Sequence, residues 1–317
     1  MPSESPFIPH RIEEWAYWIT ERENIRKLKE SGRAPPYTQD PVLAYTRYCN
    51  VRRMDDKVSK WMLENWYTPG RYPNYRTALI AALLARMINK PETLTAIIGG
   101  NRGFTHWSYD RAYKAMYEIK DRGEAVFTHA YIINGASGGP KIDQVLGAIR
   151  DCFAGCDQQA TRFIVPDSMQ RTAEALHGLR GVGSFIAGQV VADLRWVLGD
   201  VNDGWWTDRM TWAPPGPGSS RGMKYLLGIA SPADMAGRGN DLNAKQFLPN
   251  LNRLVQLARK HPKVGKVFKE RKLEAHDIQN TCCELSKFIR IKYGTGKGKN
   301  GYDPMGRYNA DQMELEI

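Results

Sequence analysis

The sequence predicts an all-α protein. Apolar residues recur every three or four positions in nearly every patterned segment, which is the spacing of one helix face. Only residues 126–134 (VFTHAYIIN) have the composition of a strand, and the centre of that stretch could equally be a buried helical turn. The chain shows no repeat of fixed period, which argues against a solenoid.

The first predicted helix spans residues 11–30, where Ile12, Trp15 and Trp18 share one face. It ends at the breaker run SGRAPP. A second helix is expected to begin at Pro41, because Asp40 is a good N-cap and proline suits the first helical position. We expect this helix to run on to residue 66.

Most of the remaining chain is also predicted to be helical. The apolar spacing indicates helices at residues 75–89, 91–98, 108–122, 142–153, 169–177, 184–197 and 273–293, with a further short one from Met223. We expect residues 1–293 to form a compact, all-helical catalytic domain in two lobes. Residues 294–317 are expected to be a flexible tail, because they begin with the Gly- and Lys-rich run GTGKGKNG.

Composition excludes several classes of protein. The 317 residues are 42% hydrophobic, which is enough for a core and excludes disorder of the whole chain. There is no long apolar run and no signal-peptide pattern, so we expect a soluble, intracellular protein without membrane contact. The five cysteines are an odd number without zinc or iron–sulfur spacing, and reduced thiols are expected.

The charge balance favours an anionic partner. Lys and Arg number 45 against 34 Asp and Glu, a net charge of +11, and the chain holds 9 Trp and 15 Tyr. Cationic side chains neutralise phosphates, and aromatic faces stack on unpaired bases. Nucleic acid is therefore one interpretation, and a merely basic surface is the other.

The most informative segment is residues 169–196, in which two amphipathic helices flank the run LRGVG. Gly181 and Gly183 allow a tight turn and leave amide groups pointing outward at the start of the second helix. Together with Arg180, these amides could hold a phosphate without reading a base.

This pattern resembles the helix-hairpin-helix of base-excision DNA glycosylases, in which an aspartate shortly downstream enters the active site. Asp203 and Asp208 compete for that position, and we favour Asp208 because Asp203-Gly204 is typical of a turn. Lyase-type glycosylases carry a lysine two residues after the second glycine. This chain has Phe185 there, so a Schiff base is not expected.

A second phosphate site is expected in the run APPGPGSSRG. Pro and Gly residues open the chain before Ser219, Ser220 and Arg221, so two hydroxyls and a guanidinium could converge on one anion ahead of the helix from Met223. The alternative is an ordinary surface loop. The chain holds no GxxxxGK[ST] motif, which disfavours P-loop kinase chemistry.

Near the C-terminus, Asn280, Glu284 and Lys287 are spaced to share one face of a helix. The alternative for Glu284 and Lys287 is a solvent-facing salt bridge. Tyr48, Asn50 and Arg52 form a similar polar group, and we expect the charge run 53–56 beyond it to face solvent. The six histidines lack zinc-site spacing, and we expect no cofactor and no metal.

Several motifs together resemble the phage α-glutamyl/putrescinyl thymine pyrophosphorylase family. They are RYCNVRRMDDKVSKW, AYIINGASGGPK, LRGVGSFIAGQVVADL, TDRMTWAPPGPGSSRG and HDIQNTCCELSKFIR, and the similarity runs from about residue 15 to 290. Members of that family are amino acid:DNA transferases of thymine hypermodification, distantly similar to helix-hairpin-helix glycosylases. A related helical domain accompanies phage 5-hydroxymethyluracil DNA kinases.

The resemblance implies a glycosylase-like helical bundle in the host cytoplasm. It also implies a substrate, double-stranded DNA with phosphorylated or pyrophosphorylated 5-hydroxymethyluracil, and a free amino acid, guessed to be glycine. The amine would displace the phosphate from the exocyclic methylene carbon after base flipping.

We expect Asp208 or Glu284 to deprotonate the amine, and Arg52, Lys287 and the 219–221 loop to neutralise the leaving group. Asn50 or Asn280 would read the uracil edge, while Tyr48 and Trp206 line the base pocket. A thiolate of Cys49, Cys282 or Cys283 could add to the ring, although buried structural cysteine is more frequent.

Two other functions fit the same residues. A monofunctional glycosylase would use Asp208 to stabilise charge on the sugar and would leave abasic sites. A non-catalytic protein would instead bind DNA and deliver it to a kinase.

Overall fold

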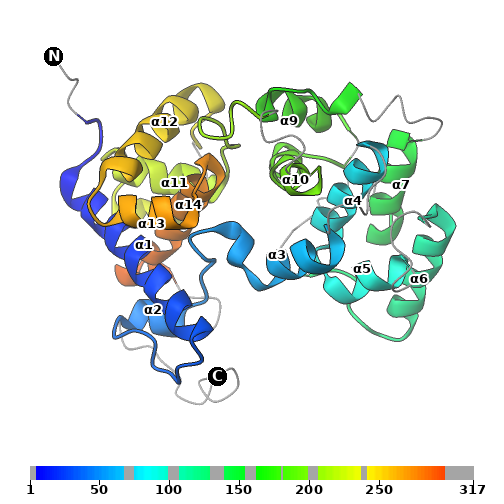
Figure 1. The fold of residues 1–317 in the computed structure, drawn as a ribbon, viewed down its shortest axis with the longest axis horizontal. Coiled ribbons are helices and arrows are strands. Elements are labelled where there is room, and N and C mark those ends of the chain that lie inside the picture. The colour runs from blue at the N-terminus through cyan, green and yellow to red at the C-terminus, as the bar shows by residue number, and fades with distance from the viewer. Residues whose placement is uncertain are drawn as a thin grey trace. The chain divides into compact units, whose positions relative to one another are not determined.

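All regular elements in the described part of the chain are helices, so the predicted all-α class is confirmed (Figure 1). The computed structural model describes residues 5–67, 75–98, 107–128, 139–153, 162–179, 181–198, 206–236 and 241–296. The chain divides into two compact units, one of Met1–Asp56 with Met210–Ile317 and one of Lys57–Arg209. We call them unit 1 and unit 2.

Unit 1 joins the two ends of the sequence around one apolar core. Figure 1 shows α1 beside α13 and α14, although more than 200 residues separate them in the chain. Its elements are α1 (Pro9–Glu30), α2 (Pro41–Tyr45), η1 (Arg53–Asp55), α11 (Pro217–Leu226), η5 (Pro232–Ala236), α12 (Ala244–Lys260), α13 (Val264–Arg271) and α14 (Ala275–Lys292).

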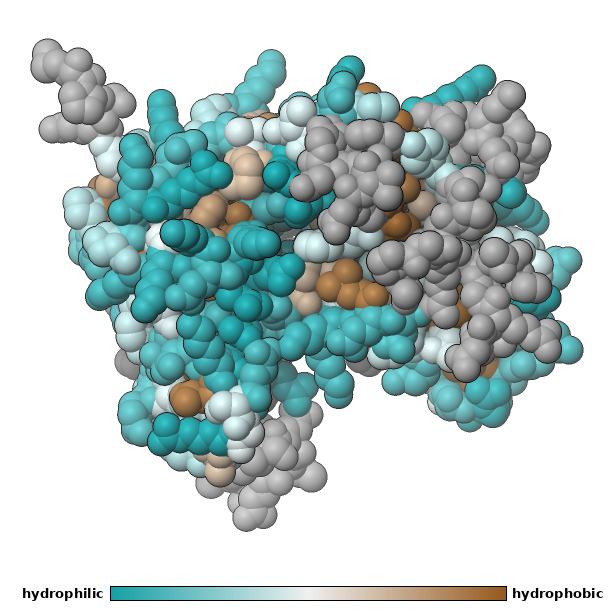
Figure 2. Space-filling model, in the orientation of Figure 1, coloured by the Kyte–Doolittle hydropathy of each residue, from teal (hydrophilic) through white to brown (hydrophobic). Residues whose placement is uncertain are grey.

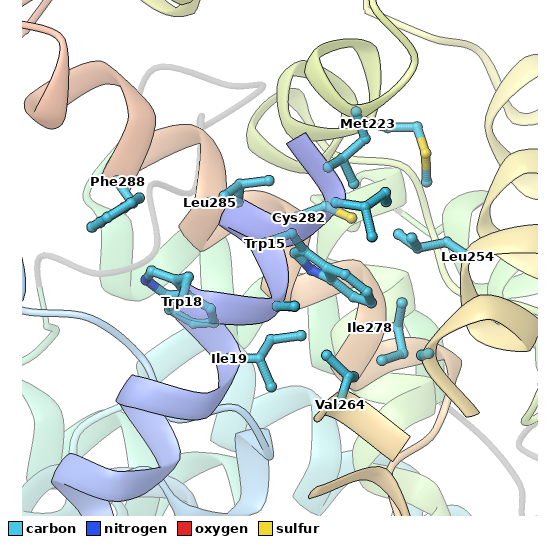
Figure 3. Packing of buried hydrophobic residues seen from close by; sticks show 14 of the residues in the cluster. Trp15, Trp18, Ile19, Met223, Leu254, Val264, Ile278, Cys282, Leu285 and Phe288 are labelled. Carbon is cyan, nitrogen blue, oxygen red and sulfur yellow. The ribbon is translucent and has the colours of Figure 1, made fainter. Parts of the chain in front are cut away.

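Large side chains of α1 and α14 fill the centre of this core. In Figure 3, Trp15 of α1 lies against Cys282 of α14, and both residues are fully buried. The indole Nε1 of Trp15 donates to Thr281 Oγ1 at 2.9 Å, so its polar atom is satisfied inside the core. The predicted first helix is thereby confirmed, and its tryptophan face anchors α14 in position.

The second predicted helix is interrupted after residue 45, and the chain is helical again only over residues 57–66. Asp40 caps it as expected, accepting from the amides of Val42 and Leu43. However, α2 ends at Tyr45, and the chain continues without regular structure to the short turn η1. Backbone amides of this stretch donate to carboxylates of Asp56, Asp277 and Glu284, which replaces the hydrogen bonds of a helix.

Helix α11 begins six residues before the predicted start at Met223. Pro217 occupies the first turn, and the hydroxyl of Ser219 accepts from the amide of Gly216, which caps the helix. Gly218 and Gly222, four residues apart, face α14 so closely that an added Cβ would collide with Cys283 Sγ and Cys282 O. The glycines of this run therefore serve helix packing rather than an open loop.

The sequence interpretation missed α12 and α13. Helix α12 carries buried Phe247, Leu251 and Leu254 at helical spacing, and Asn243 caps it together with Gln246. Pro249 lies inside this helix, and because proline usually ends a helix, the sequence pattern did not suggest one here. The capping pair was the signal that could have revealed it.

Unit 2 is a second helical body. Helices α9 and α10 coincide with their predicted spans. The elements of this unit are α3 (Lys57–Trp61), the π-helical turn η2 (Met62–Trp66), α4 (Tyr75–Ile88), α5 (Pro91–Ile97), α6 (Tyr109–Asp121), α7 (Lys141–Phe153), α9 (Met169–His177) and α10 (Ser184–Val197).

A buried ion pair joins α4 to α10. Arg86 donates from Nε and Nη2 to the two oxygens of Asp193 at 2.5 Å, and the hydroxyl of Tyr67 donates to Asp193 Oδ2 at 2.5 Å. Asp193 is fully buried and Arg86 is 2% exposed. No local pattern in the sequence marks these residues, because their pairing spans 107 positions.

Helices α9 and α10 pack on each other and are joined by the predicted glycine turn. Gly181 has φ +78°, whereas Gly183, the N-cap of α10, has φ −73° and open space where an added Cβ would lie. The two predicted helices are thus present, whereas a helix-hairpin-helix of the glycosylase kind and its binding of DNA stay predictions. Arg180 lies outside the described residues.

The two glycines allow a matched test of the turn. We expect Gly181→Ala to lower the free energy of unfolding by about 1–2 kcal/mol, because a Cβ is strained in the left-handed region. Gly183→Ser should change it by no more than about 0.5 kcal/mol, because the backbone at this N-cap suits any residue and serine is a favoured N-cap. Urea unfolding of both variants measures this, and equal losses would contradict the assigned conformation.

Other predictions fall wholly or partly outside the described residues. The strand-like stretch is described only to residue 128, where it is irregular, and the tail only to residue 296. Within the ranges described, no helix combines the length and apolar character needed to cross a membrane.

Candidate active site

The candidate site lies in unit 1, where the irregular segment 46–52 runs against α14. Arg22 of α1 holds this segment from the other side, donating to the carbonyl oxygens of Cys49 at 3.1 Å and Tyr48 at 3.3 Å. The amides of Cys49 and Asn50 then meet two carboxylates, those of Glu284 and Asp56. Tyr48, Asn50, Asn280, Glu284 and Lys287, all predicted from the sequence, are brought together here.

Glu284 is the centre of the site. It is only 4% exposed, and its Oε2 accepts from the Cys49 amide at 3.0 Å and from Lys287 Nζ at 2.7 Å. The predicted salt bridge between Glu284 and Lys287 is therefore present, but its carboxylate does not face solvent. No described residue donates to the second oxygen, Oε1. A buried carboxylate with one oxygen fixed and the other open is suited to accept a proton or a hydrogen bond.

Lys287 links Glu284 to the aromatic part of the site. Its Nζ also donates to the carbonyl of Arg47 at 3.2 Å and lies 4.9 Å from the ring centroid of Tyr48. The Tyr48 ring contacts Trp18 and Phe288 edge-on, and burial raises the pKa of its hydroxyl above the ordinary value. Tyr48 therefore remains neutral and supplies an aromatic face beside the ammonium group.

Two asparagines lie next to this pair. Asn50 is committed to the fold, since its Nδ2 donates to Asp55 O at 2.8 Å. Asn280 makes only a long contact from Nδ2 to Asn50 O, at 3.5 Å, among the described residues. Of the two candidates for reading a base edge, Asn280 therefore has the freer amide.

The charge run 53–56 does not face solvent as expected. Asp55 is 8% exposed and pairs with Arg271, and Arg52 lies 3.7 Å from the same carboxylate. Asp56 is partly buried, and its desolvation raises the pKa of its carboxyl group. The prediction failed because these carboxylates have partners inside the fold. Asp56 accepts from a backbone amide, and Asp55 pairs with Arg271, which is distant in the sequence.

Asp56 is a site residue that sequence reasoning missed. Its Oδ1 accepts from the Asn50 amide at 2.7 Å, one residue beyond the amide that binds Glu284. A carboxyl group with a raised pKa is a recognised mark of functional sites. Nothing local in the sequence distinguishes Asp56 from Asp55.

The cysteines of the site are not activated. Burial raises the pKa of the Cys49 and Cys282 thiols, and it raises that of Cys283 to about 11. Glu284 adds to the shift at Cys49 and Cys283, because a carboxylate disfavours a neighbouring thiolate. This environment does not favour the predicted attack of a thiolate on a pyrimidine ring.

The predicted phosphate loop is part of α11, and its serines are committed to the fold. Ser219 is 1% exposed and also accepts from Gln279 Nε2 at 3.0 Å, while Ser220 is fully buried and accepts from the Leu242 amide at 3.0 Å. Their burial speaks against contact with a phosphate. Arg221 differs, since its Nε has no hydrogen-bond partner among the described residues.

Asp208 lies in unit 2 and caps α9. Its Oδ1 accepts from the Met169 amide at 2.8 Å, and its Oδ2 accepts from the Gln170 amide and the Ser168 hydroxyl at 3.0 Å each. Both oxygens are thus used to stabilise a helix N-terminus. Trp206, also in unit 2, is 3% exposed, and its indole N–H lacks a partner among the described residues. Their predicted roles on the substrate stay predictions.

The described residues contain no group of three or more His, Cys, Asp or Glu side chains arranged to hold a metal ion. The site of unit 1 offers four groups of its own for chemistry. They are a buried carboxylate, a second carboxyl group of raised pKa, an ammonium group and an aromatic face.

Comparison with known proteins gives a family for most of the chain. Residues 10–298 match the family model described as the helical domain of 5-hmdU DNA kinase. The chain is similar to a curated 5-hmdU DNA kinase of Bacillus phage SP10, with 26% identity over 318 aligned positions that cover 94% of this chain. It spans only 47% of that relative.

No solved structure matches the chain. The family match covers the whole candidate site, from Arg22 to Lys287, and nearly all of the described parts of both helical units. The chain therefore belongs to the family of 5-hmdU DNA kinase helical domains.

Proposed function

We propose that this protein is an amino acid:DNA transferase that acts on activated 5-hydroxymethyluracil in phage DNA. The amine of an amino acid, for which glycine is the candidate, replaces the phosphate or pyrophosphate on the exocyclic methylene group. Membership of a family named for a kinase of 5-hmdU in DNA supports this base as the substrate. The observation that carries the transferase chemistry is the buried carboxylate of Glu284, whose Oε2 accepts two hydrogen bonds while no described residue donates to its Oε1.

The reaction needs a base because an ammonium group is not nucleophilic. In the proposed step the amine nitrogen forms a bond to the methylene carbon, and the bond from that carbon to the phosphate oxygen breaks. The electron pair leaves on the phosphate, and the proton of the ammonium group goes to the base. General base catalysis of this kind contributes about 10²- to 10⁴-fold to the rate.

Glu284 is better suited than Asp208 to be that base. Lys287 and the Cys49 amide hold its Oε2, and no described residue donates to Oε1, which is left to accept the proton in the proposed step. Asp208, in contrast, uses both oxygens to cap α9. Glu284 therefore has an oxygen to which no described residue donates, whereas Asp208 has none.

Cations of unit 1 are proposed to neutralise the leaving group. Lys287 belongs to the site, Arg52 lies two residues from Asn50, and the Nε of Arg221 has no hydrogen-bond partner among the described residues. Positioned cations stabilise the charge that develops on a departing phosphate. Asn280 would hydrogen-bond to the edge of the flipped uracil, and Tyr48 would offer a face to its ring.

The proposal takes the activated base as a substrate, since the sequence has no GxxxxGK[ST] motif with which to make it. A second candidate function follows from the match to 47% of a kinase. In that view the chain binds DNA for a kinase and catalyses nothing. The glycosylase interpretation has less support, because the aspartate it requires caps α9.

The experiment is an incubation of the protein with duplex DNA that carries phosphorylated or pyrophosphorylated 5-hydroxymethyluracil and a mixture of amino acids. Nucleoside mass spectrometry should find a thymine linked to an amino acid through nitrogen. Binding of this DNA without any adduct would favour the non-catalytic function, and abasic sites would favour the glycosylase. Either result would overturn the transferase proposal.

A further inference from the structure

The largest concentration of positive charge in the chain lies outside all of the motifs that the sequence predicts to be functional. Residues 253–272, the second half of α12 and all of α13, contain eight Lys or Arg residues and one acidic residue, Glu270. This segment alone carries a net charge of +7, out of +11 for the whole chain. It is described throughout and belongs to unit 1.

The structure turns nearly all of these cations to solvent. Arg271 pairs with Asp55 inside the unit, and the other seven Lys and Arg residues are exposed. Two carboxylates reach the edge of the segment, Glu270 paired with Lys27 and Glu13 beside His261. Among the described residues, none of the seven exposed cations forms an ion pair with a carboxylate.

The apolar residues of α13 point the other way. Val264, Val267 and Phe268 are buried in the core of unit 1, and Figure 2 shows a largely hydrophilic surface over α13. Gly265 lets α13 approach the end of α12, because an added Cβ would lie 2.7 Å from Arg259 O. Because α12 and α13 pack on each other, their exposed cations lie on neighbouring parts of the surface of unit 1.

We infer that this α12–α13 basic surface binds the phosphate backbone of double-stranded DNA. Uncompensated Lys and Arg on one face form the electrostatic footprint of a nucleic-acid-binding protein. The surface exposes no large apolar side chain, whereas binding to a lipid surface requires an apolar face to insert. It also exposes no aromatic ring for base stacking, so the contact is to the backbone and is independent of sequence.

This inference rests on the proposed function for its DNA substrate, but it assigns a surface outside the candidate site and outside the glycine hairpin. The hairpin lies in unit 2 and the basic surface in unit 1. Both are proposed to hold backbone phosphates, and the basic surface supplies most of the salt-dependent affinity. Its test needs neither an activated base nor an amino acid.

The test measures binding of an unmodified 25-base-pair duplex by fluorescence anisotropy over a range of salt. The variant replaces Lys263, Lys266 and Lys269 by Gln. A control variant replaces Lys114, Lys120 and Arg122 on and just after α6 by Gln. These residues are also exposed, although Lys114 and Arg122 pair with Glu118 and Glu124, and both variants lose three positive charges. We expect the first variant to bind at least about tenfold more weakly near 0.1 M salt, with a log–log salt slope reduced by about 2.7.

The control should keep the affinity and salt slope of the wild type. Equal losses in both variants would overturn the inference, because they would reflect net charge alone. Unchanged DNA binding in the first variant would also overturn the inference. The same holds if the first variant lost binding to phosphatidylserine vesicles but kept its binding to DNA. Failure of the transferase proposal would appear only in the nucleoside assay and would leave this result unaffected.

Discussion

Glu284→Gln should lower the rate of adduct formation by about 10²- to 10⁴-fold. The amide keeps the size of the side chain and can still accept from the Cys49 amide and Lys287, but it cannot take a proton from the incoming ammonium group. We expect the loss in kcat, with a smaller change in the KM for DNA. Single-turnover assays followed by nucleoside mass spectrometry measure both.

Glu13→Gln is the matched control for this variant. Glu13 is also in unit 1, but its side chain is 63% exposed and lies beside His261. It should keep the activity of the wild type. A folded Glu284→Gln protein that forms adduct at the rate of the wild type would remove Glu284 as the base, and the raised pKa of Asp56 would then make that carboxyl group the next candidate.

Asp193→Ala should lower the free energy of unfolding by about 3–5 kcal/mol, because it removes the carboxylate that makes two hydrogen bonds to the buried Arg86. The hydroxyl of Tyr67 loses its acceptor in the same variant. This is the largest stability effect that we expect in unit 2. Denaturant unfolding followed by tryptophan fluorescence and circular dichroism measures it.

The double variant Arg86→Met/Asp193→Leu separates the buried charge from the packing. It should be more stable than either single variant, because both charges leave the interior together. A matched control is Lys114→Ala, which removes a surface ion pair with Glu118 and should cost less than about 1 kcal/mol. An Asp193→Ala protein as stable as this control would contradict the assigned role of the pair.

Helices were predictable where one local pattern decides the structure. The tryptophan face of α1 and the glycine turn between α9 and α10 needed no information from elsewhere in the chain. In the segment after Tyr45, helical spacing predicted a helix that does not form, because the amides of Cys49 and Arg53 donate to carboxylates of α14 instead. Those partners lie more than 200 residues away, beyond the reach of any local pattern.

The residue types of the candidate site could be predicted from the sequence. Which of their side chains are already used in hydrogen bonds within the fold could not. The spacing of Asn280, Glu284 and Lys287 correctly places them on one face of a helix. Hydroxyls near glycines suggested a phosphate loop, yet Ser219 and Ser220 are buried in the contact of α11 with α14 and its neighbours. Which polar groups remain unpaired depends on tertiary packing, and in the proposed mechanism this favours Glu284 over Asp208.

The most direct test of the central claim uses ¹⁵N-labelled amino acids, supplied one at a time with duplex DNA that carries activated 5-hydroxymethyluracil. The account predicts a modified thymidine that contains one ¹⁵N, with one equivalent of phosphate or pyrophosphate released for each adduct. Glu284→Gln should form neither at an appreciable rate. Release of the phosphate without nitrogen in the nucleoside, or no release while the wild-type protein binds the DNA, would contradict the account.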